Sequence, residues 1–155
     1  MPTTARIDEI VDAMEIQDDE LPSYLDLDSG EVLTVSREIL REVEECPDDE
    51  EPDVLEWQER EVEPAQRILF SGRVLRLPGK FDIHEWDIMH DFAEAVEPQR
   101  IQEDLLYALR GRGAFGHFKD AVHRHRIEKD WYAFRTEAFR QIAIDWCEEN
   151  EIAWR

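Results

Sequence analysis

The chain has 155 residues, 42% of them hydrophobic, and its 39 acidic residues outnumber its 18 lysines and arginines to give a formal net charge of −21. This length and hydrophobic content allow a buried core, so we expect a single domain spanning residues 1–155. The negative charge disfavours general nucleic-acid binding and attraction to anionic membranes, because both of those surfaces are themselves negative.

The N-terminal part of the chain predicts a helix followed by a β-hairpin. Residues 4–15 place apolar side chains at helical spacing, namely Ile7, Ile10, Val11 and Met14. Residues 24–28 and 31–35 have strand-like patterns, and Gly30 between them can adopt the positive φ of a tight turn. The acidic residues near this turn lack the ligand spacing of a calcium loop, so a turn-forming role is favoured for them.

Residues 38–63 form a segment that we call the acidic segment. It contains 13 acidic residues against Arg41 and Arg60, a net charge of −11. A short helix is predicted over residues 37–45, and we expect Trp57 and Val62 to hold the remainder against the domain as helix. A solvated face is favoured over a specific partner site, because most runs of like charge are simply solvated.

The middle of the chain predicts a helix, a strand and a second helix. Pro64 suits the first turn of a helix through Leu69, and residues 72–78 read as a third strand that pairs antiparallel with the hairpin. The next helix covers about residues 83–96, with Ile83, Trp86, Met89, Phe92 and Val96 on its apolar face. Its start has the pattern of a capping box, Asp82 with Glu85, and of a hydrophobic staple, Phe81 with Trp86.

The polar face of the 83–96 helix raises the question of a metal site. His84, Asp87 and Asp91 are spaced i, i+3, i+7, which could place three ligands on one side of a helix. The stretch does not have the His-Glu-x-x-His spacing of a zinc protease, and no further ligand is evident. An exposed acidic face is therefore favoured, and we predict no metal.

The C-terminal half predicts three further helices. They begin near Pro98, Ala114 and Lys129, and the apolar face that we expect for the second one comprises Phe115, Phe118, Val122 and His125. We expect His125 to be a partly buried histidine with its hydrogen bonds satisfied. Arg135 falls inside the apolar arc of the last helix, so it must extend to solvent, stack on an aromatic ring or pair with a carboxylate. A structural salt bridge is favoured over a ligand-binding role.

Residues 110–126, which we call the basic corner, differ in charge from the rest of the chain. They contain five arginines and lysines and one acid, Asp120, for a net charge of +4. Gly111, Gly113 and Gly116 spell G-x-G-x-x-G, but a helix precedes them, whereas a dinucleotide site requires a strand there. A structural turn between two helices is favoured over a ligand site.

Cysteine usage and hydropathy indicate the compartment. Cys46 and Cys147 are isolated, so we expect neither a disulfide framework nor zinc. No apolar run approaches the length of a membrane span, and the N-terminus lacks a long apolar region. These features predict a cytoplasmic protein.

Several short stretches of the chain are distinctive when taken together. They are YLDLDSGEV at 24–32, DIMHDF at 87–92, GRGAF at 111–115 with FKD at 118–120, WYAFR at 131–135 and AIDW at 143–146. In these stretches the chain resembles a bacterial group, Uncharacterised Protein Family 0158, over most of its length from about Leu21. The resemblance implies no assigned activity and supplies no catalytic residues, and the acidic residues 48–53 lie outside it.

These observations predict an α+β fold with a small antiparallel sheet of about three strands, packed with helices, and an all-helical C-terminal half. Within the single domain, residues 21–78 form the sheet-containing half and residues 82–150 the helical half. We predict a non-enzymatic binding or protein-interaction module without a cofactor. The predicted binding residues are Arg110, Arg112, Lys119, Arg124 and Arg135.

The expected partner is a protein or a small anion, and the acidic segment could itself dock on the basic corner of the same or another copy. The alternative is an enzyme, or a metal-dependent hydrolase, whose acid and base groups lie on the 83–96 helix. No motif of a hydrolase nucleophile supports that alternative, because the chain contains no G-x-S-x-G and neither cysteine has a histidine near it in sequence.

Overall fold

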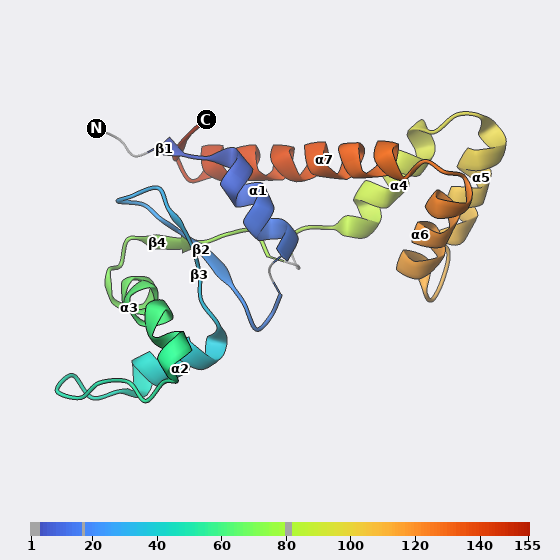
Figure 1. Cartoon of the computed structure of the whole chain (residues 1–155). Coiled ribbons are helices and arrows are strands. Elements are labelled where there is room, and N and C mark those ends of the chain that lie inside the picture. The colour runs from blue at the N-terminus through green and yellow to red at the C-terminus, as the bar shows by residue number, and fades with distance from the viewer. Residues whose placement is uncertain (1–3, 17, 80–81) are drawn as a thin grey trace. The chain divides into compact units, whose positions relative to one another are not determined.

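Figure 1 shows a computed structural model of the chain, which describes residues 4–16, 18–79 and 82–155. The helices are α1 (Ile7–Ile16), α2 (Arg37–Glu45), the 3₁₀ helix η1 (Glu56–Glu61), α3 (Val62–Phe70), α4 (Glu85–Ala95), α5 (Gln99–Ala108), α6 (Ala114–Arg124) and α7 (Glu128–Glu149). The strands are β1 (Thr4–Ala5), β2 (Ser23–Asp26), β3 (Val32–Thr34), β4 (Val74–Arg76) and β5 (Ala153–Trp154). The α+β prediction is confirmed.

The chain divides into two compact units. The first unit comprises residues 1–82 and 142–155, and the second unit comprises residues 83–141. The organisation as a single domain therefore stays a prediction, and each unit is described by itself below.

The first unit contains the predicted three-stranded antiparallel sheet, in the order β3-β2-β4. In the central strand, Leu25 pairs with Val32 on one side and with Leu75 on the other. The turn after β2 places Gly30 at φ 78°, as predicted, because a residue with a Cβ is disfavoured in this region. Four apolar residues of α1 that were predicted to face inward, Ile7, Ile10, Val11 and Met14, are buried.

A second pairing in the first unit was not predicted. β1 and β5 form a short parallel ladder in which Thr4 lies opposite Ala153 and Ala5 opposite Trp154. The backbone of Arg155 extends it, since its N–H donates to the carbonyl of Ala5 at 3.0 Å. Two-residue strands are too short to produce a period-two pattern, and β5 lies after residues 82–150, which were predicted as the helical half.

Helices α2 and α3 close a separate apolar cluster in the first unit. Its buried residues are Val35, Ile39, Val43 and Ala65, with Leu40, Val54, Val62, Ile68 and Leu69 packed against them. Ser36 caps α2, because its hydroxyl accepts a hydrogen bond from the N–H of Ile39 at 3.3 Å. Val62 therefore holds the acidic segment in place as expected, but the same expectation for Trp57 is wrong, since its side chain is 64% exposed.

The second unit is organised around a cluster of aromatic rings. The ring of Phe92 from α4 contacts those of Trp131 and Phe134 from α7 edge-on, each at 5.4 Å between centroids. Phe118 from α6 packs against Trp131 at 4.9 Å. These edge-to-face contacts and the complete burial of Phe118 fix α6 against α4 and α7.

Several predicted details of α4 and α6 are wrong, and one of them is Trp86, which was expected on the apolar face of α4 but is 40% exposed. The capping residue of α4 is His84, and Asp82 instead accepts a hydrogen bond from the N–H of Gly79 at 2.9 Å. Glu85 binds an arginine of α7, so no capping box forms, while Phe81 of the predicted staple lies outside the described residues. Phe115, expected on the inward face of α6, is 48% exposed, because α6 turns Ala114, Phe118, Ala121 and Val122 inward.

Candidate functional site

The basic corner is a helix–turn–helix joint whose glycines have a backbone role. Helix α5 ends at Ala108, and Gly111 and Gly113 then adopt φ values of 70° and 74°. Gly113 is the N-cap of α6, which begins at the next residue. The left-handed conformation at both positions accounts for these glycines, since it is costly for residues with a Cβ.

Arg110 and Arg112 are exposed in this joint, and Lys119 is exposed in the second turn of α6. Within the part of the chain that the structure describes, no carboxylate pairs with any of these three side chains. Two large aromatic side chains are exposed beside them, Tyr107 at 70% and Phe115 at 48%. The Arg110 guanidinium lies 5.8 Å from the centroid of the Tyr107 ring, a cation–π distance.

The first turn of α6 adds a further positive contribution. It contains no acidic residue, and the N-cap Gly113 offers no side-chain hydrogen bond to the helix. At the N-terminus of α6, the first helical hydrogen bond is made by the N–H of His117, which donates to the carbonyl of Gly113 at 2.9 Å. The preceding N–H groups therefore face outward at the positive end of the helix dipole, where anionic groups are stabilised.

Arg124 is also part of the predicted surface, but it lies at the other end of α6, about 15 Å along the helix from its start. Its guanidinium donates to Asp104 Oδ2 at 2.7 Å, and His125 Nε2 lies 2.6 Å from the same oxygen. The hydrogen bond from Arg124, followed by that with His125, lowers the pKa of Asp104 below its ordinary value. His125 is thus a partly buried histidine with a hydrogen-bond partner, as predicted.

Arg135 is separate from the basic corner. Its Nε and Nη2 atoms donate to Glu85 Oε1 at 2.9 and 2.7 Å, and the guanidinium stacks 4.2 Å from the Phe139 ring centroid. The favoured expectation of a structural salt bridge is therefore confirmed. Arg110, Arg112 and Lys119 are exposed and have no ion pair among the described residues, whereas Arg124 and Arg135 are held in ion pairs within the second unit.

Helix α4 brings together a different set of possible metal ligands from the one considered in the sequence. His90, Asp91 and Glu94 each offer a ligand atom, and these atoms lie within 4.8 Å of one another. Among the residues that the structure describes, His84 and Asp87 are not part of such a group. Asp91 and Glu94 are exposed acids in an acidic chain and His90 is partly buried against Trp86, so we attach no function to the group.

The cysteines are both free thiols. Burial raises the pKa of Cys147 to about 11, and burial together with the charge of Glu50 raises that of Cys46. A thiol with a raised pKa is a poor nucleophile at neutral pH, so neither residue has the environment of a catalytic cysteine.

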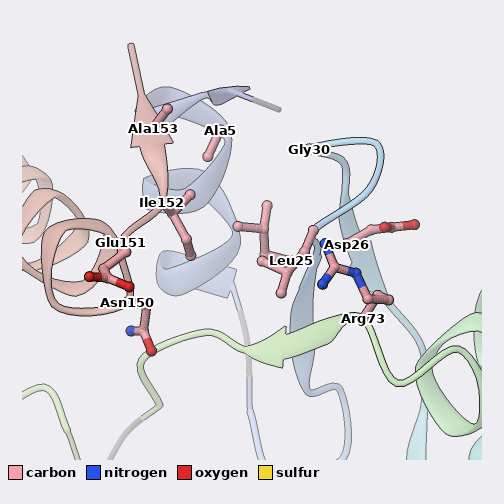
Figure 2. Close-up of a pocket in the computed structure, with 10 residues that line it drawn as sticks. Ala5, Leu25, Asp26, Gly30, Arg73, Asn150, Glu151, Ile152 and Ala153 are labelled. Carbon is pink, nitrogen blue, oxygen red and sulfur yellow. The ribbon is translucent and has the colours of Figure 1, made fainter. Parts of the chain in front are cut away.

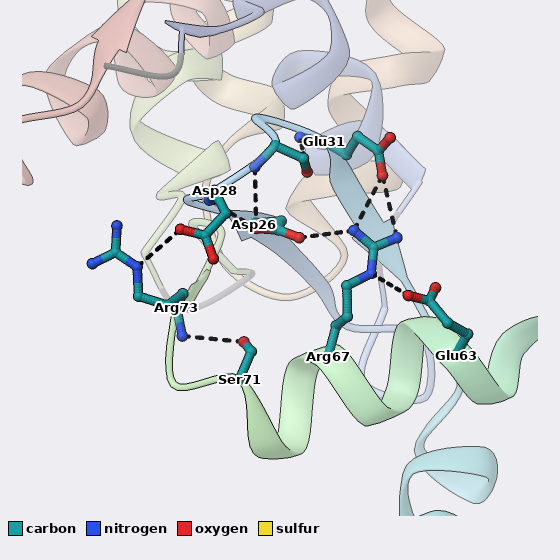
Figure 3. A network of polar contacts seen from close by, with 8 residues as sticks. Asp26, Asp28, Glu31, Glu63, Arg67, Ser71 and Arg73 are labelled. Carbon is teal, nitrogen blue, oxygen red and sulfur yellow. Dashed lines mark hydrogen bonds and ion pairs between the residues drawn. The ribbon is translucent and has the colours of Figure 1, made fainter. Parts of the chain in front are cut away.

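A network that the sequence did not reveal joins the hairpin to α3 in the first unit (Figure 3). Arg67 donates to Asp26 Oδ2 at 2.8 Å and also pairs with Glu31 at 3.3 Å and with Glu63 at 2.9 Å. Only the Glu63–Arg67 pair, four residues apart on one helix, has a local signal in the sequence. The Asp26–Arg67 contact spans 41 residues and depends on the folded hairpin.

Asp26 also shapes the turn of the hairpin. Its Oδ1 accepts hydrogen bonds from the N–H groups of Asp28 at 2.8 Å and Ser29 at 3.3 Å. Burial alone would raise the pKa of Asp26, but the N–H of Asp28, the Arg67 guanidinium and the groups of Ser29 together outweigh it and lower the pKa below its ordinary value. The carboxylate is therefore held in its charged form.

This lowered pKa predicts a specific loss of stability in acid. The unfolded carboxyl has a pKa of about 3.9. Because the folded value is lower, the contribution of Asp26 is complete above the unfolded pKa and is lost as pH falls through the folded one. We expect the difference in unfolding free energy between the native protein and Asp26→Asn to shrink over that range, as measured by urea titrations at successive pH values. A difference that stays constant with pH would contradict the assignment.

The fold and the surface define a small, strongly acidic α+β protein with a localised basic corner. The chain belongs to the Uncharacterised protein family UPF0158, whose sequence model matches residues 1–155. It is similar to UPF0158 protein PA5073 of Pseudomonas aeruginosa, with 32% identity over 152 residues that cover 97% of this chain and 86% of the relative. No solved structure matches the chain. No helix among the described residues has the length and apolar character needed to span a membrane.

Proposed function

We propose that this protein is a non-enzymatic binding module of the cytoplasm, and that its basic corner docks an acidic segment of a partner protein. The observation that carries the proposal is the group formed by Arg110, Arg112 and Lys119, which have no carboxylate partner among the described residues although the chain has a net charge of −21. Asp104 and Glu85 of the same unit pair with Arg124 and Arg135, so the three unpaired cations differ from these two in being open to a partner.

The neighbouring aromatic residues support a protein partner over a small anion. Tyr, Phe and Arg are enriched at protein interfaces, where rings supply buried area and arginines supply directional hydrogen bonds. Tyr107 and Phe115 flank the cations and are exposed in the free protein. At physiological ionic strength charges beyond about 8 Å are largely screened, so a docked acidic segment responds mainly to the local positive charge of the corner.

Charge reversal tests the proposal directly. The double variant Arg112→Glu/Lys119→Glu should weaken binding of a fluorescently labelled peptide rich in Glu and aromatic residues by at least about tenfold, because attraction at the corner becomes repulsion. Fluorescence anisotropy measures the affinity, and affinity capture with the same variant should lose the partners that the native protein recovers. Binding by the native protein should weaken at high salt.

A control with the same net charge is available in the first unit. Arg37→Glu/Arg41→Glu reverses two exposed arginines of α2 and changes the net charge by the same amount. This control should leave the affinity within about twofold, because its charges are not at the corner. The proposal is wrong if the two double variants weaken binding equally, or if charge reversal at the corner leaves binding unchanged.

A further inference from the structure

The first unit contains a small pocket between the sheet and the C-terminal end of α7 (Figure 2). Its volume is about 220 Å³, and the side chains of Leu25 and Ile152 line its apolar middle. This volume is below the roughly 300–1,000 Å³ of sites for drug-sized ligands, so an occupant must be small. Figure 2 shows charged and polar side chains on two opposite sides of these apolar residues.

One side of the pocket presents a cation. Arg73 uses its Nε atom to contact Asp28 Oδ1 at 3.1 Å, and no other contact of its guanidinium is found among the described residues. A guanidinium has five N–H donors, so four remain available. Asp26 also lines this side of the pocket. Its Oδ2 accepts a hydrogen bond from Arg67 at 2.8 Å, so this oxygen does not compete with a ligand for Arg73.

The other side of the pocket presents acceptors. Asn150 donates its Nδ2 to the carbonyl of Trp146 at 2.8 Å, which leaves its Oδ1 as an acceptor. Glu151 follows at φ 57°, a left-handed position after the end of α7 where glycine is the usual residue. Its exposed carboxylate has no partner in the part of the chain that the structure describes.

We propose that this pocket binds a small zwitterion whose carboxylate and ammonium groups stand at opposite ends of a short apolar body, as in an unblocked dipeptide. Arg73 binds the carboxylate, Glu151 and Asn150 bind the ammonium, and Leu25 and Ile152 contact the apolar body. A zwitterion has no net charge, so the field of a chain with a net charge of −21 does not repel it as it repels a simple anion.

Titration of the 155-residue chain with alanyl-leucine tests this proposal. Amide shifts of Gly30 and Ile152 in NMR spectra should saturate, and calorimetry should give the dissociation constant. The N-acetyl dipeptide lacks the ammonium and the dipeptide amide lacks the carboxylate, and each should bind at least about tenfold more weakly, about 1.4 kcal/mol. Absence of saturable shifts, or equal binding of the blocked dipeptides, overturns the proposal.

Substitutions assign each end of the ligand. Arg73→Gln should lower the affinity for alanyl-leucine to the affinity that the native protein has for the dipeptide amide. The affinity of the variant for the amide should equal that of the native protein, because the substitution and the amide remove the same contact. Glu151→Gly should lower the affinity for alanyl-leucine toward that of the N-acetyl dipeptide, and should leave the affinity for the N-acetyl dipeptide unchanged. Glycine suits the backbone of position 151, so this variant separates ligand binding from folding.

Two further variants control for indirect effects. Arg76→Gln removes an exposed arginine of β4, the strand that directly follows Arg73, without altering the pocket lining, and should leave dipeptide affinity unchanged. Ala153→Leu should fill the pocket and abolish binding without any change of charge. Thermal unfolding of every variant verifies the fold, and an Arg76→Gln effect equal to that of Arg73→Gln would contradict the assignment.

Discussion

Arg67→Met should lower the free energy of unfolding by about 3 kcal/mol, because it leaves the buried carboxylate of Asp26 without its cation. The Asp26 side chain is only 8% exposed, and the Arg67 guanidinium contacts it at 2.8 Å. Methionine retains the length of the aliphatic stem, so the loss is mainly electrostatic. Urea unfolding, followed by circular dichroism, measures the change.

The neighbouring pair Arg73–Asp28 provides the control. It has the same chemistry and joins the same hairpin at 3.1 Å, but its side chains are 59% and 65% exposed. Exposed ion pairs contribute little, so Arg73→Met should cost about 0.5 kcal/mol or less. If the two arginines cost the same, then burial of Asp26 does not determine the strength of the network.

The difference between these two pairs could not be read from the sequence. Asp26, Asp28 and Glu31 appear there as three similar acids around a predicted turn. Only the fold places Arg67 of α3 over the buried member of the set. Turn formation depends on neighbouring residues, whereas burial and ion pairing depend on residues that are distant in sequence.

The elements that were predicted correctly have strong local signals. The helix over Ile7–Ile16 has an uninterrupted apolar stripe, and the hairpin has a glycine at the position that requires a positive φ. Arg135 was predicted to pair because a cation inside an apolar arc has few alternatives. Its partner Glu85, 50 residues away, was instead assigned to a capping box, because a local pattern was available for it.

The candidate surface was predicted only in part. Its charge is visible in composition, so Arg110, Arg112 and Lys119 could be named from the sequence. The exposure of Phe115 could not be predicted from the sequence, because Phe115 and Phe118 both fit an apolar stripe with helical spacing. Phe118 is the ring that contacts Phe92 and Trp131, and these contacts with residues distant in sequence decide which of the two rings is buried.

Phe118→Ala should lower the free energy of unfolding by about 4 kcal/mol, because it removes a fully buried ring and leaves a cavity. The ring contacts Trp131 at 4.9 Å and Phe92 at 6.3 Å between centroids, so its loss affects the aromatic cluster of the second unit. Hydrogen exchange of the α6 amides should accelerate in step with this loss. It provides a measurement local to the second unit.

Phe115→Ala is the matched control, since it makes the same chemical change on the same helix at a ring that is 48% exposed. We expect its unfolding free energy to stay within about 1 kcal/mol of the native value. Phe115→Ala should nevertheless lower the affinity for the acidic peptide by about fivefold or more, because exposed rings at an interface become buried on binding. Phe115 would then act in binding and Phe118 in folding. A loss of stability in Phe115→Ala as large as that in Phe118→Ala would show that this helix face is packed in the free protein, and the basic corner would lose its aromatic contact.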